Sequence, residues 1–514
     1  MTDVPTPEES QELLSAGTAP TERAPWWRIV CASFSYMTVQ LSFGFVFALF
    51  TPLLTNDLEV PVTWTPLLWW IGPLCGLLQP FLGAWSDGCQ SRFGRRRPFI
   101  LVGTAIVLAG YVLFYFVHDI SHALGDREHF HPAGITIAIL AMVVLNIAIN
   151  VVMGPSRAIV CDLSAGGRES FGNNMISLMI GAANLISNLV VFLVTSSATP
   201  FIIGVILVIL SVIPTLFFAK EKQYKRAPGT KIPNPCVRIF RALRTMRGPV
   251  LRACIVFFLS WAAYFPSPPT PPPSWGPSTT APPRPGRIRV RSDLKAFAAA
   301  LMPAMLPAMM PGGASFVPFM FQPASMRYFG AAVGDDAFEQ GKRVGAAAIA
   351  ASSLVTALFS AISTWLMNLI GLKVTYFAAQ LIATGAYVGL FFASTTVEVF
   401  IYFCLIGINF SLFNSVPFAL VSESVGESDA GLYAGGMNIF CVAAQFVSLG
   451  ITSGVSAIWP HNMEFIMLAC AILSLVATGL VPILKRGKKN AVQTTTEVSD
   501  RLPLNSEDPV DPAV

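Results

Sequence analysis

Apolar runs long enough to cross a bilayer recur along this chain, and they restrict its fold more than any other feature. A spanning helix needs ~20 apolar residues to match a hydrocarbon core about 30 Å thick. Only 12% of the residues are charged, whereas soluble proteins carry about 25%. The sequence therefore predicts an all-α integral membrane protein in contact with the lipid bilayer. We expect twelve transmembrane helices near 29–53, 64–83, 98–117, 134–160, 171–195, 200–219, 249–265, 344–370, 374–393, 397–421, 430–455 and 463–484.

The twelve runs divide into two sets of six. We expect a cytoplasmic tail at 1–28, an N-terminal six-helix half at 29–219, a basic loop at 220–248, a C-terminal half at 249–485 and a disordered cytoplasmic tail at 486–514. Arginine and lysine cluster after the second run, in the central loop and after the last run. Because cytoplasmic loops are enriched in these residues, both termini are predicted to be cytoplasmic. Residues 9–14 resemble an acidic dileucine signal, so the plasma membrane and a vacuolar or lysosomal membrane both stay open.

Residues 267–317 do not fit the helical pattern. The stretch is first rich in proline with scattered arginine, and then repeats alanine, methionine and proline. Such a composition cannot form a spanning helix. Removing it would join 261–266 to Phe319 and restore a helix of ordinary length. We therefore expect a low-complexity insertion in the C-terminal half, either an intron translated in frame or a genuine extracellular loop.

The run at 145–163 carries polar and charged side chains inside an apolar helix. A charge at membrane depth costs at least ~2.5 kcal/mol, so it normally faces a bundle interior or a water-filled cavity. Arg157, with Asn146 and Asn150 on the same run, therefore indicates a site for a solute. The alternative is that Arg157 lies near the membrane surface, where it snorkels or pairs with Asp162.

The loop at 83–98 has the sequence GAWSDGCQSRFGRRRP. Asp87 is spaced so that it can pair with an arginine and cap a neighbouring helix. Such a pair would act as a latch that holds one side closed and breaks when that side opens. The alternative is an arginine cluster that only sets the topology. The spacing resembles the loop-two/three motif of the major facilitator superfamily.

A longer block narrows this resemblance. Residues 66–101 resemble the glycoside-pentoside-hexuronide:cation symporter branch, in particular plant sucrose/proton symporters and animal proton-associated sugar transporters. The segment 145–163, with Gly-Pro-x-Arg-Ala followed by Asp, matches the same branch, and the likeness covers about 29–266 and 319–485. It implies a carrier that moves sucrose or a related glycoside by alternating access, with protons as the coupling ion. It also implies that Arg157 contacts the sugar or the coupling carboxylate, and that the latch consists of Asp87, Arg92 and Arg95.

Sugar hydroxyls bind amides and guanidinium groups, and a sugar ring packs against an aromatic face. We expect about half of the buried amides to form helix–helix hydrogen bonds instead. Asp162 and Glu423, at predicted cytoplasmic helix ends, are candidates for coupling or gating. The candidate substrate-binding residues are Arg157, Asn146, Asn150, Gln40, Trp69, Asn184, Asn409 and Asn438.

Three potential proton-coupling positions depart from the branch, and the first lies in helix four. Members of the branch place an aspartate eleven residues before the arginine of helix four, where this chain has Asn146. An amide cannot take up or release a proton at physiological pH. A proton-independent sugar uniporter and a non-transporting sensor or scaffold of the same fold therefore stay open.

Several function classes find no support in the sequence. The chain has no phosphate-binding loop, GxSxG or HExxH, so we expect no enzyme, no catalytic residues and no cofactor beyond the coupling proton. Nine cysteines form no CxxC pair, and the histidines of 118–132 lack ligand spacing, so we expect no metal site. A net charge of +5, spread over short loops, argues against nucleic acid. The oligomeric state stays open.

Overall fold

The computed structural model describes a defined part of the chain. Trp69, the segment 267–317 and the tails 1–23 and 486–514 lie outside the described residues, and so do the predictions made for them. The described residues are 24–54, 58–60, 68, 71–127, 131–193, 199–221, 237, 239–240, 244, 246, 248–264, 335–393, 395–424, 430–458 and 465–485.

Helices occur at every one of the twelve predicted runs. The first six runs correspond to α2 (Trp26–Pro52), α4 (Ile71–Gly76) with α5 (Gln79–Asp87), α6 (Arg97–Tyr115), α8 (Pro132–Ser164), α9 (Glu169–Leu193) and α10 (Thr199–Phe218). The last six correspond to α12 (Gly248–Tyr264), α15 (Asp335–Ile370), α16 (Leu372–Phe392), α17 (Thr396–Ser424), α18 (Ala430–Ile458) and α19 (Phe465–Leu480), which continues into the short 3-10 helix η5 (Val481–Ile483). The all-α fold is confirmed.

Nine of the described helices are long and apolar enough to cross a membrane. The other three runs are not among these nine. The second run is broken into α4 and α5 at Leu77–Leu78, and α12 has only 17 residues. Helix α9 has 25 residues and buries Asn173, Asn174 and Ser177. For these three runs the membrane-spanning role stays a prediction.

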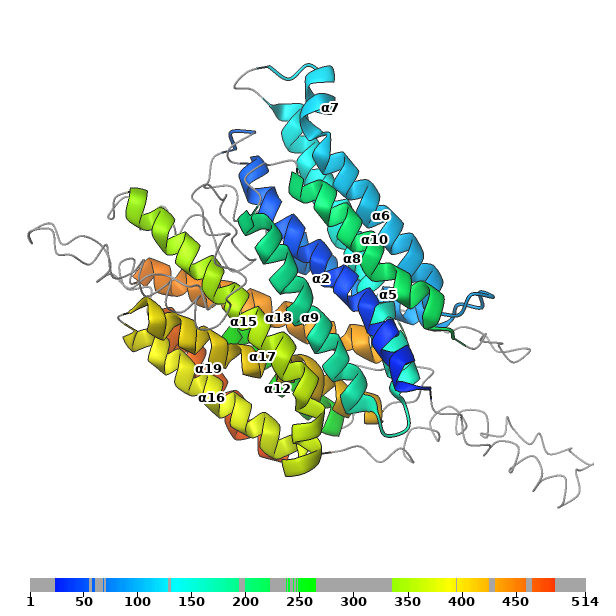
Figure 1. Cartoon of the computed structure of the whole chain (residues 1–514), viewed down its shortest axis with the longest axis vertical. Coiled ribbons are helices and arrows are strands. Elements are labelled where there is room, and N and C mark those ends of the chain that lie inside the picture. The colour runs from blue at the N-terminus through cyan, green and yellow to red at the C-terminus, as the bar shows by residue number, and fades with distance from the viewer. Residues whose placement is uncertain are drawn as a thin grey trace, which may run out of the picture.

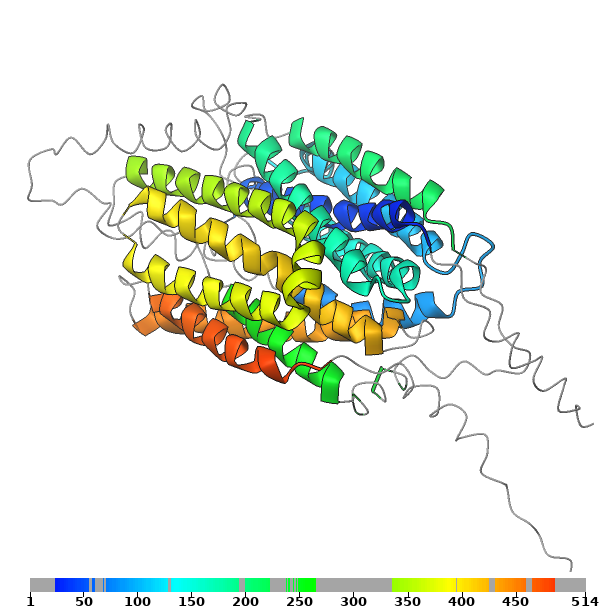
Figure 2. The ribbon, with the colours of Figure 1, turned by 60° about the horizontal axis from the view of Figure 1, so that its bottom comes forward.

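The helices form two groups that follow the two halves of the chain. Figures 1 and 2 show α2 to α10 gathered on one side and α12 to α19 on the other, with α9 next to α15 and α5 next to α18. Two glycines allow the halves to touch closely. A Cβ on Gly435 of α18 would lie 2.6 Å from Cα of Pro80, and one on Gly181 of α9 would lie 2.5 Å from the backbone N of Ala357. The halves are therefore in direct backbone contact at both places.

The predicted loop 118–132 contains a short helix, α7 (Val117–Ala123). After it, the Asp126 carboxylate accepts hydrogen bonds from the backbone N–H groups of Ala133 and Gly134, at 3.0 and 2.8 Å. Burial pushes the pKa of Asp126 upward, but these two hydrogen bonds outweigh it and the pKa lies below its ordinary value. The carboxylate thus satisfies backbone donors in the first turn of α8. Within the described ranges, no group of three or more His, Cys, Asp or Glu could hold a metal ion.

Candidate functional site

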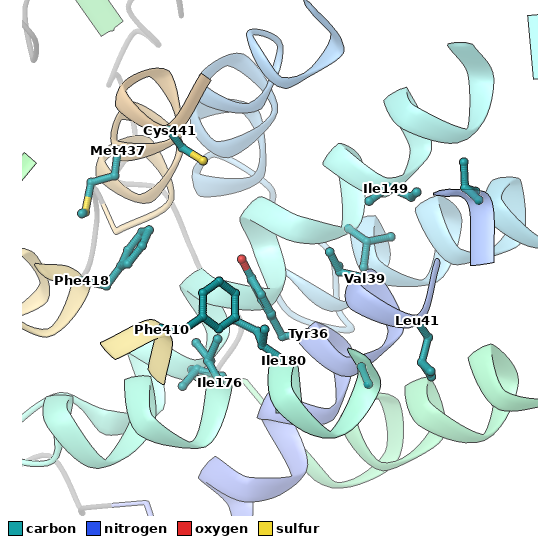
Figure 3. Close-up of a cluster of buried hydrophobic side chains, with 14 of the residues drawn as sticks. Tyr36, Val39, Leu41, Ile149, Ile176, Ile180, Phe410, Phe418, Met437 and Cys441 are labelled. Atoms are coloured by element: carbon teal, nitrogen blue, oxygen red, sulfur yellow. The ribbon is translucent and has the colours of Figure 1, made fainter. Parts of the chain in front are cut away.

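A cavity of about 210 Å³ lies between the two halves. Both halves contribute to its wall, through α2, α4, α5, α8 and α9 on one side and α12, α15, α17 and α18 on the other. Figure 3 shows Tyr36, Phe418 and Cys441, which come from α2, α17 and α18, arranged around one space. A ligand in this cavity would touch both halves at once.

Arg157 lies at the wall of this cavity and is only 3% exposed. Its Nη1 donates to Oδ1 of Asn173 at 3.3 Å and to the backbone carbonyl of Asn414 at 3.2 Å. The guanidinium carbon also sits 4.8 Å from the ring centre of Tyr36 and 3.5 Å from that of Phe418. These contacts with aromatic faces favour a cation in a dry site. Arg157 is therefore in the bundle interior, and the surface position offered as the alternative is wrong.

Amide side chains supply most of the polar surface of the cavity. Five predicted binding residues line it: Arg157, Gln40, Asn150, Asn184 and Asn438. Three further amides, Gln79, Asn188 and Gln445, also line it, and their side-chain oxygens are buried with no hydrogen-bond partner among the described residues. A buried acceptor without a donor costs about 1–3 kcal/mol, so a ligand that brings hydroxyl donors would be stabilised here.

Aromatic rings form the remaining wall. Phe257, Trp261 and Tyr264 of α12 line the cavity together with Phe410 and Phe418 of α17. The Tyr264 and Phe410 rings stack with their centres 4.4 Å apart. These five residues are not among those predicted from the sequence. Their pattern was nevertheless visible there, because positions 257, 261 and 264 follow the i, i+4, i+7 spacing of one helix face.

Two predicted binding residues do not line the cavity. Asn146 is fully buried in the core and donates to the Met142 carbonyl at 2.8 Å. Asn409 donates to Oε1 of Gln380 at 2.8 Å, and Gln380 donates to Ser260, so this amide joins α17, α16 and α12. Both predictions are corrected, since these amides serve packing within a half. The expectation that some amides are structural applies to them.

Asp87 forms both the ion pair and the helix cap that its spacing predicts, but the ion pair is with Arg96. Its Oδ1 lies 2.5 Å from Nη1 of Arg96, and its Oδ2 accepts the backbone N–H of Leu432 at 3.0 Å. Leu432 is the third residue of α18, so Asp87 caps a helix of the other half. Arg92 instead lies over the ring of Phe93 on the exposed loop, at 5.0 Å. The pairing of Asp87 with Arg92 is thus corrected to Arg96.

Asp162 belongs to the same charged cluster. Its Oδ2 lies 3.1 Å from Nη2 of Arg95 and 3.3 Å from Nε of Arg96. We call the end of the bundle that carries Asp87, Arg95, Arg96 and Asp162 the arginine-rich end. Glu423 lies half-buried in the last turn of α17. Neither Asp162 nor Glu423 lines the cavity.

The neighbouring carboxylates keep the Arg96 side chain charged. Burial alone would lower the pKa of Arg96, but the nearby Asp87 and Asp162 carboxylates outweigh it and raise the pKa above its ordinary value. Burial raises the pKa of Glu221, although its carboxylate accepts the backbone N–H groups of Arg96 and Arg97 at 2.9 and 3.3 Å. The Arg96 side chain therefore stays a cation at physiological pH and can hold both aspartates.

Three known proteins are similar to this chain in sequence. The chain is 29% identical over 260 residues to the sucrose transport protein SUT3 of Oryza sativa subsp. japonica, a match that covers 44% of this chain and 51% of that protein. It is 34% identical over 152 residues to the sucrose transport protein SUC4 of Arabidopsis thaliana, covering 29% and 30%. It is 35% identical over 171 residues to proton-associated sugar transporter A of Mus musculus, covering 33% and 22%. The chain thus spans about half the length of these relatives, or less.

Two solved structures share the fold. The human organic anion transporter MFSD10 (TETRAN) matches with a TM-score of 0.58 at 13% identity, over 89% of this chain and 100% of that one. A bacterial homologue of the iron transporter ferroportin, in an outward-facing state, matches with a TM-score of 0.55 at 11% identity, over 89% and 98%. Residues 29–319 match the Major Facilitator Superfamily. This is a family of transporters, which agrees with the expectation that the chain is not an enzyme. The chain belongs to the Major Facilitator Superfamily.

Proposed function

We propose that this chain is a membrane carrier that moves sucrose or a related glycoside by alternating access. The observation that carries the proposal is that three amides line the cavity together with Arg157 and have buried side-chain oxygens with no hydrogen-bond partner among the described residues, so that small rotations can offer these oxygens to a ligand. Sugar hydroxyls can donate to those oxygens and accept from the guanidinium, and the aromatic wall suits the apolar face of a sugar ring. The names of the three relatives, which are sucrose or sugar transporters, support the same substrate class.

The arginine-rich end is proposed to be the cytoplasmic end. Its basic loop follows the rule that cytoplasmic loops carry arginine and lysine. The bond from Asp87 to Leu432 joins the two halves at that end, and the ion pair with Arg96 holds Asp87 in place for it. In this role Asp87 and Arg96 hold the cytoplasmic side closed, and the Asp87–Leu432 bond must break before a sugar can leave toward the cytoplasm.

The residues that line the cavity favour a uniporter that works without protons. Among its described lining residues there is no aspartate, glutamate or histidine. Asn146 stands where the branch has an aspartate, and Asp162 is held by Arg95 and Arg96 away from the cavity. A proton symporter needs a group that changes its protonation as the sugar binds. We therefore propose facilitated transport ahead of proton symport.

The test is uptake of radiolabelled sucrose into proteoliposomes. Replacing Asn188 by alanine removes one free acceptor in the cavity and should raise KM for sucrose about fivefold, the value of one hydrogen bond of ~1 kcal/mol. The matched control is Asn409→Ala, because Asn409 donates to Gln380 within the C-terminal half and does not line the cavity. It should leave KM unchanged.

Two results would contradict the proposal. Equal KM changes in both variants would mean that the cavity does not bind the sugar. Saturable sucrose binding without any uptake would favour the sensor or scaffold of the same fold.

A further inference from the structure

Two hydrogen bonds cross between the halves at the cavity, and they mirror each other. Nη1 of Arg157, on α8, donates to the backbone carbonyl of Asn414 on α17 at 3.2 Å. Nδ2 of Asn438, on α18, donates to the backbone carbonyl of Gly76 on α4 at 3.0 Å. Each half thus contributes one side-chain donor and one backbone acceptor. All four residues line the cavity.

Proline explains why the Gly76 carbonyl is available. In a continuous helix the Gly76 carbonyl would accept the N–H of residue 80, but residue 80 is a proline and has none. The helix breaks there, between α4 and α5, and Asn438 supplies the missing donor. In α17, Pro417 has no N–H to donate to the Phe413 carbonyl, so the hydrogen-bond ladder is interrupted one residue before Asn414. The Gly76 carbonyl therefore belongs to a helix break, and the Asn414 carbonyl lies next to a second interruption.

A bound sugar and these carbonyls need the same donors. A hydroxyl oxygen accepts hydrogen bonds as a carbonyl oxygen does, and both donors face the space in which the ligand would lie. When Arg157 leaves the Asn414 carbonyl, it still keeps Asn173 and the ring of Tyr36, which belong to its own half. Release therefore does not leave a buried cation without contacts.

We infer that Arg157 and Asn438 form an inner gate, whose bonds to the opposite half are displaced by the ligand itself. The inference rests on the proposed function, and it assigns a second role to two binding residues. Ligand hydroxyls take over the two donors, the halves lose the two bonds that join them at the cavity, and the arginine-rich end is freed to open. The inner gate is distinct from the Asp87 contacts, since Asp87 does not line the cavity and cannot sense the ligand directly.

A native cysteine reports on this opening. Cys161 lies four residues after Arg157, and Oγ of Ser422 donates to its sulfur across the halves at 3.1 Å. Cys161 is buried, at 7% exposure, and Ser422 of α17 lies against its sulfur. Separation of α8 from α17 would expose it. The rate of Cys161 alkylation therefore measures how often the halves part beside the gate.

The experiment uses the purified full chain in which the other eight cysteines are replaced by alanine or serine. Alkylation of Cys161 by N-ethylmaleimide is followed by peptide mass spectrometry, with and without sucrose. Asn438→Ala and Arg157→Met should each raise the sugar-free rate about fivefold, as expected for loss of one hydrogen bond. Sucrose should raise the rate of the parent chain and add little in either variant. Asn409→Ala, a buried amide away from the cavity, should behave like the parent.

Sucrose transport by the same preparation separates the two proposals. If the chain transports sucrose but the rate of Cys161 alkylation changes neither with the substitutions nor with the sugar, or with only one of them, the inner gate is wrong. The proposal of a sugar carrier is then unaffected. A chain that neither binds nor transports sucrose, while both substitutions still accelerate Cys161, overturns the sugar carrier and supports the gate contacts. If Arg157→Met does not fold, Asn438→Ala decides the outcome alone.

Discussion

At the scale of single residues, three successive arginines perform three different tasks. Gly94 has a φ of 103°, which a residue with a side chain rarely adopts, and it turns the chain just before them. Arg95 pairs with Asp162, and Arg97 donates to the Leu216 carbonyl. Arg96 is fully buried between Asp87 and Asp162 and also donates to Ser86. It is therefore the arginine on which the charged cluster depends.

Replacing Arg96 by glutamine should strongly destabilise the protein, whereas Arg92→Gln should not. Removing one partner of a buried ion pair costs about 3–5 kcal/mol, because the other charge stays buried without compensation. Arg92 is exposed, and surface substitutions usually change stability by no more than about 0.5 kcal/mol. Thermal unfolding in detergent measures both. Equal shifts in the two variants would show that the cluster is held by its surroundings rather than by Arg96.

At the scale of helices, the sequence predicts the position of each helix along the chain better than it predicts which side chains reach the cavity. All twelve apolar runs are helical, because length and hydropathy suffice to place them. Asn146 and Arg157 are eleven residues apart and share a helix face, but that spacing is about 16 Å of helix, which carries Asn146 beyond the cavity. Asn150, seven residues from Arg157 and about 10 Å along the helix, does reach it. The face follows from the sequence, whereas the extent of the cavity depends on the packing of other helices.

The same limit applies to the latch and to the broken second helix. Arg92, Arg95 and Arg96 all follow Asp87 at spacings that allow an ion pair, and only the turn at Gly94 decides among them. The run 64–83 stays apolar throughout, so its hydropathy gives no sign of the break at Leu77–Leu78. The sign was Pro80, four residues after a carbonyl that then lacks its donor.

Two adjacent glycines of α18 should respond in opposite ways to alanine. A Cβ on Gly435 would meet the backbone of Pro80 and Gln79 at 2.6 and 2.9 Å, so α18 must move away from α5. Overpacking of this kind costs about 1–3 kcal/mol. A Cβ on Gly436 would meet nothing within 4 Å, and glycine costs a helix about 1 kcal/mol relative to alanine. Gly435→Ala should lower the unfolding temperature and Gly436→Ala should keep or raise it. A stable Gly435→Ala protein would show that the halves are not in tight contact here.

At the scale of the whole molecule, the polar segments gather where the halves meet. The broken second run and α9, which buries several amides, both line the cavity and both contact the other half. Their amides and broken backbone are tolerated because they face a cavity rather than lipid. Helices on the outside, such as α6 and α10, are the apolar ones with large exposed side chains. The halves are thus apolar bodies with a polar seam between them, and a carrier that rocks around a central site needs such a seam.

This arrangement predicts how transport depends on the membrane potential. A uniporter that moves a neutral sugar carries no net charge, so a potassium diffusion potential set with valinomycin should not change the final level of sucrose in proteoliposomes. A symporter that moves one proton per sugar would gain about 2.3 kcal/mol per 100 mV, which corresponds to an accumulation of about 50-fold. We expect the first result, because the described cavity wall offers no carboxylate or histidine.

The variant Asn150→Asp tests whether the missing carboxylate is the reason. Asn150 is buried and lines the cavity, so a carboxyl group there would take up a proton readily beside the ligand, and sucrose accumulation should come to depend on the potential. Uptake by Asn150→Leu, which is buried but cannot titrate, should stay independent of the potential and controls for changes in packing. Accumulation by the unmodified chain would contradict the uniporter and make Asp162, the carboxylate held between Arg95 and Arg96, the next residue to replace.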